Sequence, residues 1–175
     1  GRYRGRAVGS VRGGEETVAE MAAQRHITGE DKGPRRPSGI QNQGIFLKAN
    51  SAVVGPGEGV AIRFPDRRND HEVEFVIIIG KTGSRIKKED AMDYVAGYTL
   101  GLEMTVRGVG DRSFRKSCDG YAPVGPWMAT ADEIPDPSNV AFTVHLNGNL
   151  QQDAHTSDLI FDVPRLIEFA SEFYT

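Results

Sequence analysis

One stretch, residues 70–80, joins two acidic side chains to a run of β-branched and aromatic residues that ends at a glycine. Such a run predicts a buried strand. Because successive side chains of a strand point to opposite faces, Glu72 and Glu74 share one face, and Val73 and Phe75 line the other. Two carboxylates in the interior would repel each other unless a cation lies between them, and a hard divalent ion is the natural partner. The alternative is an edge strand whose glutamates lie in water.

A second strand is predicted over residues 97–107, which alternate apolar and polar side chains. Its polar face carries Glu103 and, four residues on, Arg107. Between the two strands, residues 88–96 have apolar side chains at helical spacing and are followed by a glycine, so we expect a helix there. Strand, helix and strand would then present three glutamates to one pocket.

The rest of the chain predicts shorter elements. They are a helix over residues 15–25, a short strand over 45–48, an irregular loop over 109–127, and a strand over 140–146 with a hairpin partner over 150–153. Asn147-Gly148 is a strong hairpin signal. Asp162 is expected to cap a final helix, and its buried stripe is expected to consist of Leu166, Ile167, Ala170 and Phe173. Together these elements predict a β-rich domain with helices on the outside.

Composition narrows the class of protein. A chain of 175 residues with 38% apolar side chains is long enough for one core. Its single cysteine, Cys118, cannot form an internal disulfide and fits a reducing compartment. No stretch approaches the length of apolar sequence that spans a membrane, and the N-terminus lacks the apolar core of a signal peptide. With a net charge of −3 and no sustained basic face, nucleic acid is not expected as a partner. These features predict a soluble, cytoplasmic protein.

Several short motifs occur in an order that is typical of one enzyme family. They are Phe46-Leu47-Lys48, Ser51-Ala52-Val53-Val54-Gly55-Pro56, Glu72-Val73-Glu74, Gly80-Lys81, Asp93-Tyr94-Val95-Ala96-Gly97-Tyr98-Thr99, Lys116-Ser117-Cys118-Asp119 and Gly125-Pro126. An ordered set of motifs is more specific than any one of them. Over residues 45–175 the chain resembles the fumarylacetoacetate hydrolase superfamily, in its branch of 2-hydroxyhepta-2,4-diene-1,7-dioate isomerases and acylpyruvate hydrolases.

The resemblance implies a fold and a metal. The fold would be of the α+β class, with a mixed β-sandwich or β-roll core and peripheral helices. In the family, the two glutamates of the first strand and an acid on the next bind Mg²⁺ or Mn²⁺, which corresponds to Glu72, Glu74 and Glu103 here. The third acid is usually an aspartate. Since Mg²⁺ demands near-ideal octahedral geometry, the longer Glu103 would shift the ion or favour a more tolerant one such as Ca²⁺.

The resemblance also implies residues that act on the substrate. The family's substrate-binding arginine and lysine correspond to Arg107 and Lys116, and Lys116 would also be catalytic. A glutamine that commonly follows the arginine has no counterpart in residues 108–110. A lid in the family carries a histidine and, three residues later, a glutamate, which together activate water. Alignment keeps the catalytic glutamate as Glu20 but places Thr17 at the position of the histidine.

Two regions follow from this alignment. Residues 1–44 would form a leader and lid, and residues 45–175 the catalytic domain. Family members continue into a Gly- and Pro-rich segment with a Thr-Gly-Thr-Pro motif, which this sequence does not contain. The sequence would then be a fragment, or the protein has lost that part.

The leading hypothesis is a divalent-metal-dependent enzyme acting through an enolate on a small 2-oxo or 2,4-dioxo carboxylic acid, as in aromatic-compound catabolism. C–C bond hydrolysis, decarboxylation and keto-enol isomerisation share such an enolate, and the absent lid histidine weakens hydrolysis relative to the other two. The alternative is a non-catalytic homologue that keeps the fold for a structural or partner-binding role. A homodimer is expected from the resemblance alone.

Overall fold

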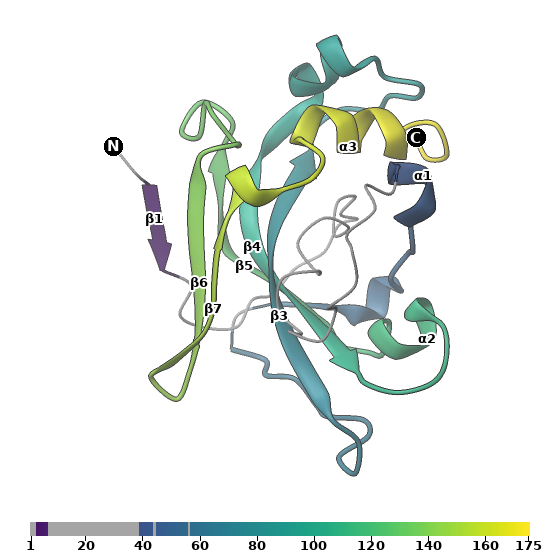
Figure 1. Ribbon diagram of the computed structural model, residues 1–175, viewed down its shortest axis with the longest axis vertical. Helices are drawn as coiled ribbons and strands as arrows, with labels where there is room; N and C mark the ends of the chain where they lie inside the picture. The colour runs from purple at the N-terminus through teal and green to yellow at the C-terminus, as the bar shows by residue number, and fades with distance from the viewer. Residues whose placement is uncertain (1–2, 7–38, 44, 56) are drawn as a thin grey trace.

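The computed structural model describes residues 3–6, 39–43, 45–55 and 57–175, which form two β-sheets with helices around them (Figure 1). The four-stranded sheet has the order β2 (Val53–Val54), β5 (Ala122–Thr130), β4 (Val95–Val106), β3 (Asn69–Ile79). The three-stranded sheet has the order β1 (Tyr3–Arg6), β6 (Val140–Leu146), β7 (Asn149–His155). Each sheet holds one parallel pair, β2 with β5 and β1 with β6, so both sheets are mixed. The predicted α+β, β-rich fold class is confirmed.

The two sheets share one hydrophobic core. Its members include alternate residues of β3 and of β6, one tyrosine of β4, and two residues of the final helix (Val163–Ala170): Val73, Phe75, Ile77, Tyr98, Val140, Phe142, Val144, Val163 and Ile167. The ring of Phe75 stacks on Tyr98, with centroids 5.1 Å apart, and lies 6.2 Å from the ring of Phe142. The apolar face predicted for the first strand is therefore the face that packs against the second sheet.

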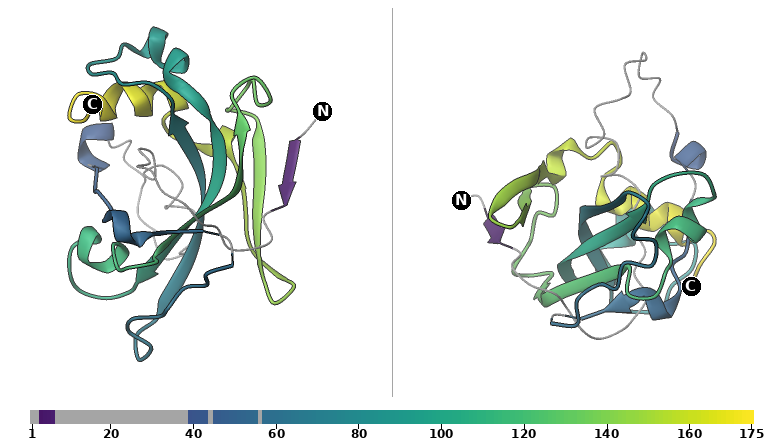
Figure 2. Two further views of the ribbon diagram at one scale, coloured as in Figure 1. Left: turned by 180° about the vertical axis from the view of Figure 1, so that it is seen from behind. Right: turned by 90° about the horizontal axis from the view of Figure 1, so that it is seen from below.

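Helices cover the ends of the sheets. The α-helices are α1 (Ile40–Gln43), α2 (Arg112–Lys116) and α3 (Val163–Ala170), and the 3-10 helices are η2 (Asn50–Ala52), η3 (Lys88–Tyr94) and η4 (Thr156–Asp158). Ile40 of α1 packs against Leu166 and Phe169 of α3, and the view from behind shows these two helices side by side (Figure 2). No helix among the described residues is long and apolar enough to cross a membrane.

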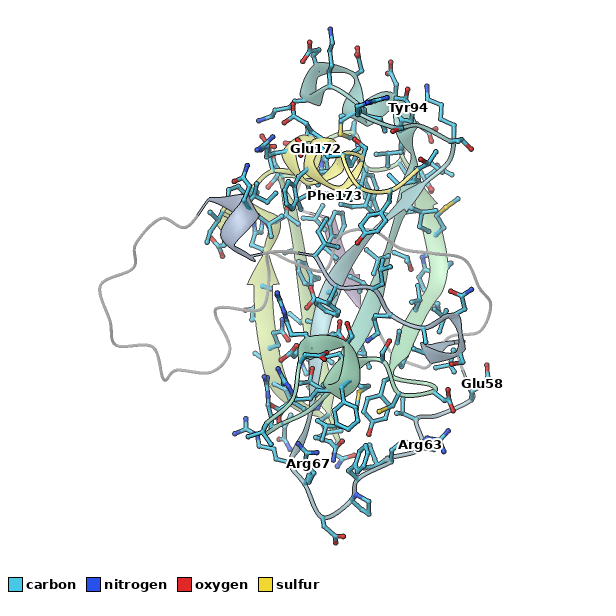
Figure 3. The ribbon with its side chains drawn as sticks, turned by 90° about the vertical axis from the view of Figure 1, so that its right-hand side faces the viewer. Glu58, Arg63, Arg67, Tyr94, Glu172 and Phe173 are labelled. Atoms are coloured by element: carbon cyan, nitrogen blue, oxygen red, sulfur yellow. The ribbon has the colours of Figure 1, made fainter. Side chains whose placement is uncertain are left out.

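The final helix begins as predicted but ends earlier. The Asp162 side chain accepts a hydrogen bond from the backbone N–H of Arg165, with Pro164 in the first turn. Because α3 ends at Ala170, Phe173 lies beyond it and is 62% exposed, so its assignment to the buried stripe is wrong. Figure 3 shows Phe173 and Glu172 at the end of the molecule opposite Arg67.

The helix predicted over residues 88–96 is present as a 3-10 helix but ends two residues earlier than predicted. Residues 88–94 form η3, and β4 begins directly at Val95. Gly97 does not end a helix. A Cβ placed on it would lie 2.3 Å from the carbonyl oxygen of Ala129 in β5, so the glycine permits close approach of two strands.

Two further expectations differ from the structure. Residues 109–127 are not an irregular loop, because they contain α2 and the first part of β5. Residues 45–48 form no strand and instead run irregularly towards η2.

The hairpin at Asn147-Gly148 is confirmed, with both residues at positive φ as a tight turn requires. The helix predicted over residues 15–25 lies outside the described residues.

Candidate active site

Three buried glutamates lie together on β3 and β4. The antiparallel register places Glu72 directly opposite Glu103, and Glu74 opposite Gly101, the next position on the same face. Glu72 and Glu74 are each 2% exposed, and Glu103 is fully buried. Among the described residues β3 is an edge strand, as the alternative supposed, but its two glutamates are buried and do not lie in water, so that part of the alternative is wrong. The register brings the three predicted carboxylates to one face.

Two cations contact Glu72. The Lys116 ammonium donates a hydrogen bond to Oε2 at 2.7 Å, and the Arg107 guanidinium pairs with Oε1. The Thr105 hydroxyl lies 3.4 Å from Oε2. Lys116 is itself only 2% exposed, which is rare for a lysine and is explained by this pairing. Both substrate-binding residues predicted from the sequence therefore lie beside a predicted metal ligand.

A third cation, Lys48, was not assigned a role from the sequence. Its ammonium pairs with Oε1 of Glu103 and donates a hydrogen bond to the backbone carbonyl of Tyr121 at 3.0 Å. The signal that identifies it is its place in the Phe46-Leu47-Lys48 motif, where a single charge follows two apolar residues. What the sequence does not reveal is the partner, since Glu103 lies 55 residues further along the chain.

Lys48 and Lys116, the last residue of α2, are followed by segments that are hydrogen-bonded to each other. The backbone N–H of Ala49 donates to the Ser117 hydroxyl at 2.6 Å, and the N–H of Gly120 donates to the Ser51 carbonyl at 3.0 Å. The Ser51 hydroxyl donates to Asp119 at 2.7 Å. These contacts join the residues that directly follow Lys48 to those that directly follow Lys116. They fix the positions from which both ammonium groups enter the site.

Arg107 is oriented by a second carboxylate. Its Nε donates to Oδ2 of Asp70 at 2.6 Å, while Arg68 donates to Oδ1 at 2.7 Å. Burial alone would raise the pKa of Asp70, but the hydrogen bonds and charges of Arg68 and Arg107 outweigh it and hold the pKa below its ordinary value. Asp70 therefore stays ionised near neutral pH and keeps one edge of the guanidinium in place. The sequence pattern around Asp70 predicts no such role for it.

The donor set suits a hard divalent ion, because Mg²⁺ and Mn²⁺ prefer carboxylate oxygens. As the side chains stand, no three His, Cys, Asp or Glu groups within the described ranges are arranged to hold a metal ion. The physical reason is visible at Glu72 and Glu103, whose carboxylates are turned to Arg107, Lys116 and Lys48. The three glutamates therefore suit a divalent ion by their chemistry, their burial and their strand register, while their side chains are turned towards other partners. Binding an ion requires carboxylate oxygens to rotate from these cations towards a common point.

The catalytic role expected for Glu20 has no structural test here, since this residue lies outside the described part of the chain. The same holds for Thr17. Among the described residues, the candidate site consists of the predicted metal ligands Glu72, Glu74 and Glu103, the predicted substrate-binding residues Arg107 and Lys116, and the added Lys48 and Asp70.

The chain is similar to proteins of known activity. It is 54% identical over 136 residues to a maleylpyruvate hydrolase of Aquipseudomonas alcaligenes, covering 78% of this chain and 47% of that protein. It is 38% identical over 140 residues to a mitochondrial oxaloacetate tautomerase of Caenorhabditis elegans, covering 75% of this chain and 64% of that one. The chain thus spans about half to two thirds of the length of these relatives.

Solved structures agree with the sequence comparison. The crystal structure of a maleylpyruvate hydrolase from Sphingobium sp. SYK-6 matches with a TM-score of 0.72 at 44% identity, covering 80% of this chain and 52% of that one. The same enzyme in complex with manganese(II) and pyruvate matches with a TM-score of 0.70, covering 74% and 48%. The model of the fumarylacetoacetate hydrolase C-terminal family matches residues 6–175. The chain therefore belongs to the fumarylacetoacetate hydrolase family, in its branch of acylpyruvate hydrolases and isomerases.

Proposed function

We propose that this protein is a divalent-metal-dependent enzyme that acts on acylpyruvates, a class of 2,4-dioxo carboxylic acids. The observation that carries the proposal is the set of three buried glutamates on one face of β3 and β4, with Lys116 buried against one of them. The similar enzyme from Sphingobium was crystallised with manganese(II) and pyruvate, and pyruvate is the product that acylpyruvate hydrolysis releases. Mn²⁺ or Mg²⁺ would be the ion, held by Glu72, Glu74 and Glu103.

The bound ion would act as a Lewis acid on the oxo acid. Arg107, held by Asp70 and 29% exposed at its side chain, would bind the substrate carboxylate. Lys116 would donate a hydrogen bond, and then a proton, to the oxygen on which negative charge develops. Its ammonium already lies 2.7 Å from Glu72, beside the position proposed for the ion. Lys48 would offset part of the negative charge of Glu103.

C–C bond hydrolysis is the reaction that the similarity to maleylpyruvate hydrolases favours. Water would add to the acyl carbonyl, the bond from that carbon to the methylene would break, and its electron pair would leave as the enolate of pyruvate, which is then protonated. The relative at 54% identity is named for this reaction.

The alternative reaction is keto-enol isomerisation, which is the reaction of the named oxaloacetate tautomerase. It is favoured by the absence of the lid histidine, since Thr17 stands at that position. Glu20 would position the water or move a proton.

Turnover measurements separate these reactions. We expect the full chain with Mn²⁺ to release pyruvate from maleylpyruvate, to do so more slowly with Mg²⁺, and to stop when a chelator is added. Oxaloacetate supplied as its enol tests the isomerase alternative, because its ketonisation is followed by ultraviolet absorbance without any pyruvate release. No metal-dependent change in either substrate would contradict the proposal and favour the non-catalytic role.

We also propose a homodimer, which rests on the family resemblance, and a cytoplasmic location, which rests on the single cysteine, Cys118. We expect light scattering at micromolar concentration to give twice the mass of the chain. A monomer at that concentration would contradict the first of these.

A further inference from the structure

The backbone of the residue between the two glutamates of β3 is hydrogen-bonded to a side chain from the other sheet. Val73 separates Glu72 from Glu74, and its backbone N–H donates to Oε1 of Gln152 at 2.9 Å. Nε2 of the same glutamine donates to the Val73 carbonyl at 3.1 Å. Gln152 lies on β7 and is 8% exposed. A single side-chain amide thus makes both of the hydrogen bonds that a neighbouring strand would make to this residue.

The position of β3 explains why this contact matters. In the described part of the chain β3 is the last strand of its sheet, with β4 along one side only. The free backbone edge of β3 at Val73 faces Gln152 of the three-stranded sheet. The Val73 side chain packs in the core that the two sheets share. A buried N–H and C=O at such an edge each need a partner, and Gln152 supplies both. The backbone around Val73 is therefore fixed from both sides at the residue that sets the spacing of the two carboxylates.

We propose that Gln152 is a positioning residue for the metal site, acting through the backbone of Val73 on Glu72 and Glu74. This rests on the proposed function, because it needs those glutamates to bind an ion. Carboxylate oxygens must lie at about 2.1 Å from Mg²⁺ or Mn²⁺ in near-octahedral geometry, so a small shift of the strand weakens binding. Groups that orient metal ligands typically change metal affinity by about 10- to 100-fold when they are replaced.

A matched control separates this role from a purely structural one. Thr156, which is 3% exposed, accepts a hydrogen bond from the backbone N–H of Val140 at 2.9 Å. Thr156→Val removes a buried bond from side chain to backbone of the same kind, but it does so at β6, which carries none of the three glutamates. Both Gln152→Met and Thr156→Val are expected to lower the melting temperature. Only the change at Gln152 is expected to weaken metal binding.

The experiment titrates Mn²⁺ into the full chain and follows the free ion by electron paramagnetic resonance. We expect Gln152→Met to raise the dissociation constant by about 10- to 100-fold and Thr156→Val to leave it unchanged. Gln152→Glu, which keeps an acceptor for the Val73 N–H but loses the donor, should still fold and also bind the ion more weakly. If the wild type binds Mn²⁺ and the Gln152 variants bind it equally well, the inference is wrong while the proposed function stands. If the wild type binds no Mn²⁺, both fall.

Discussion

Replacing Lys116 with methionine is expected to lower kcat for pyruvate release by about 10²- to 10⁴-fold, the range typical of a positioned proton donor. Methionine has a similar length and keeps the apolar contacts of the side chain, but it cannot donate to a developing negative charge. Arg107 remains on the other oxygen of Glu72, so that carboxylate still has a cation beside it. The ion should therefore still bind while the chemical step slows.

Two measurements make this expectation specific to the site. The Mn²⁺ affinity of Lys116→Met should not fall below that of the wild type, because the change removes a cation that competes for Glu72, and this separates a loss of chemistry from a loss of metal. Lys88→Met is the matched control, because Lys88 pairs with Asp162 at the surface, where both side chains are 48% exposed. Its kcat should not change. An unchanged kcat in Lys116→Met would remove Lys116 from the reaction.

Glu72→Gln is expected to lower the free energy of unfolding by about 3–5 kcal/mol in the absence of metal, as is usual when one partner of a buried ion pair is removed. The change would leave the buried Lys116 ammonium and the Arg107 guanidinium without the carboxylate that they share. From the sequence alone the opposite result is expected, since three carboxylates in an empty site repel one another and the loss of one charge should be harmless. The contacts reverse that expectation, and urea unfolding with a chelator present measures it.

The control for this stability effect is Glu168→Gln. Glu168 pairs with Arg165 in α3, but both side chains are about one third exposed, so solvent screens the pair. Its removal should leave the urea midpoint close to that of the wild type. Equal midpoints for Glu72→Gln and the wild type would show that the Lys116 and Arg107 contacts do not stabilise the folded chain.

The sequence predicts the strands of the site well because their patterns are strong. Residues 70–80 and 97–107 were predicted within two residues at each end of β3 and β4, and the assignment of Glu72, Glu74 and Glu103 to one face agrees with the register. Alternation of apolar and polar residues is a local property, so it can be recognised without knowledge of the fold. The cap of α3 at Asp162 is local in the same sense.

The errors occur where distant residues decide the structure. Gly97 resembles a helix stop in its local sequence, but it is required by the close approach of Ala129 in another strand. Lys116 lies in a segment that has no apolar periodicity, and only the fold shows that it is buried against Glu72. Lys48 and Gln152 contact residues 55 and 79 positions away, so local sequence does not reveal their partners.

We infer above all that the glutamates of β3 and β4 hold a divalent ion. Titration of Mn²⁺ into the metal-free full chain, followed by electron paramagnetic resonance of the free ion, tests it directly. We predict one bound ion per chain for the wild type, stronger binding when pyruvate is present, and loss of the bound ion in Glu74→Gln. A wild-type titration curve that matches buffer without protein, or a Glu74→Gln curve that matches the wild type, would contradict the claim.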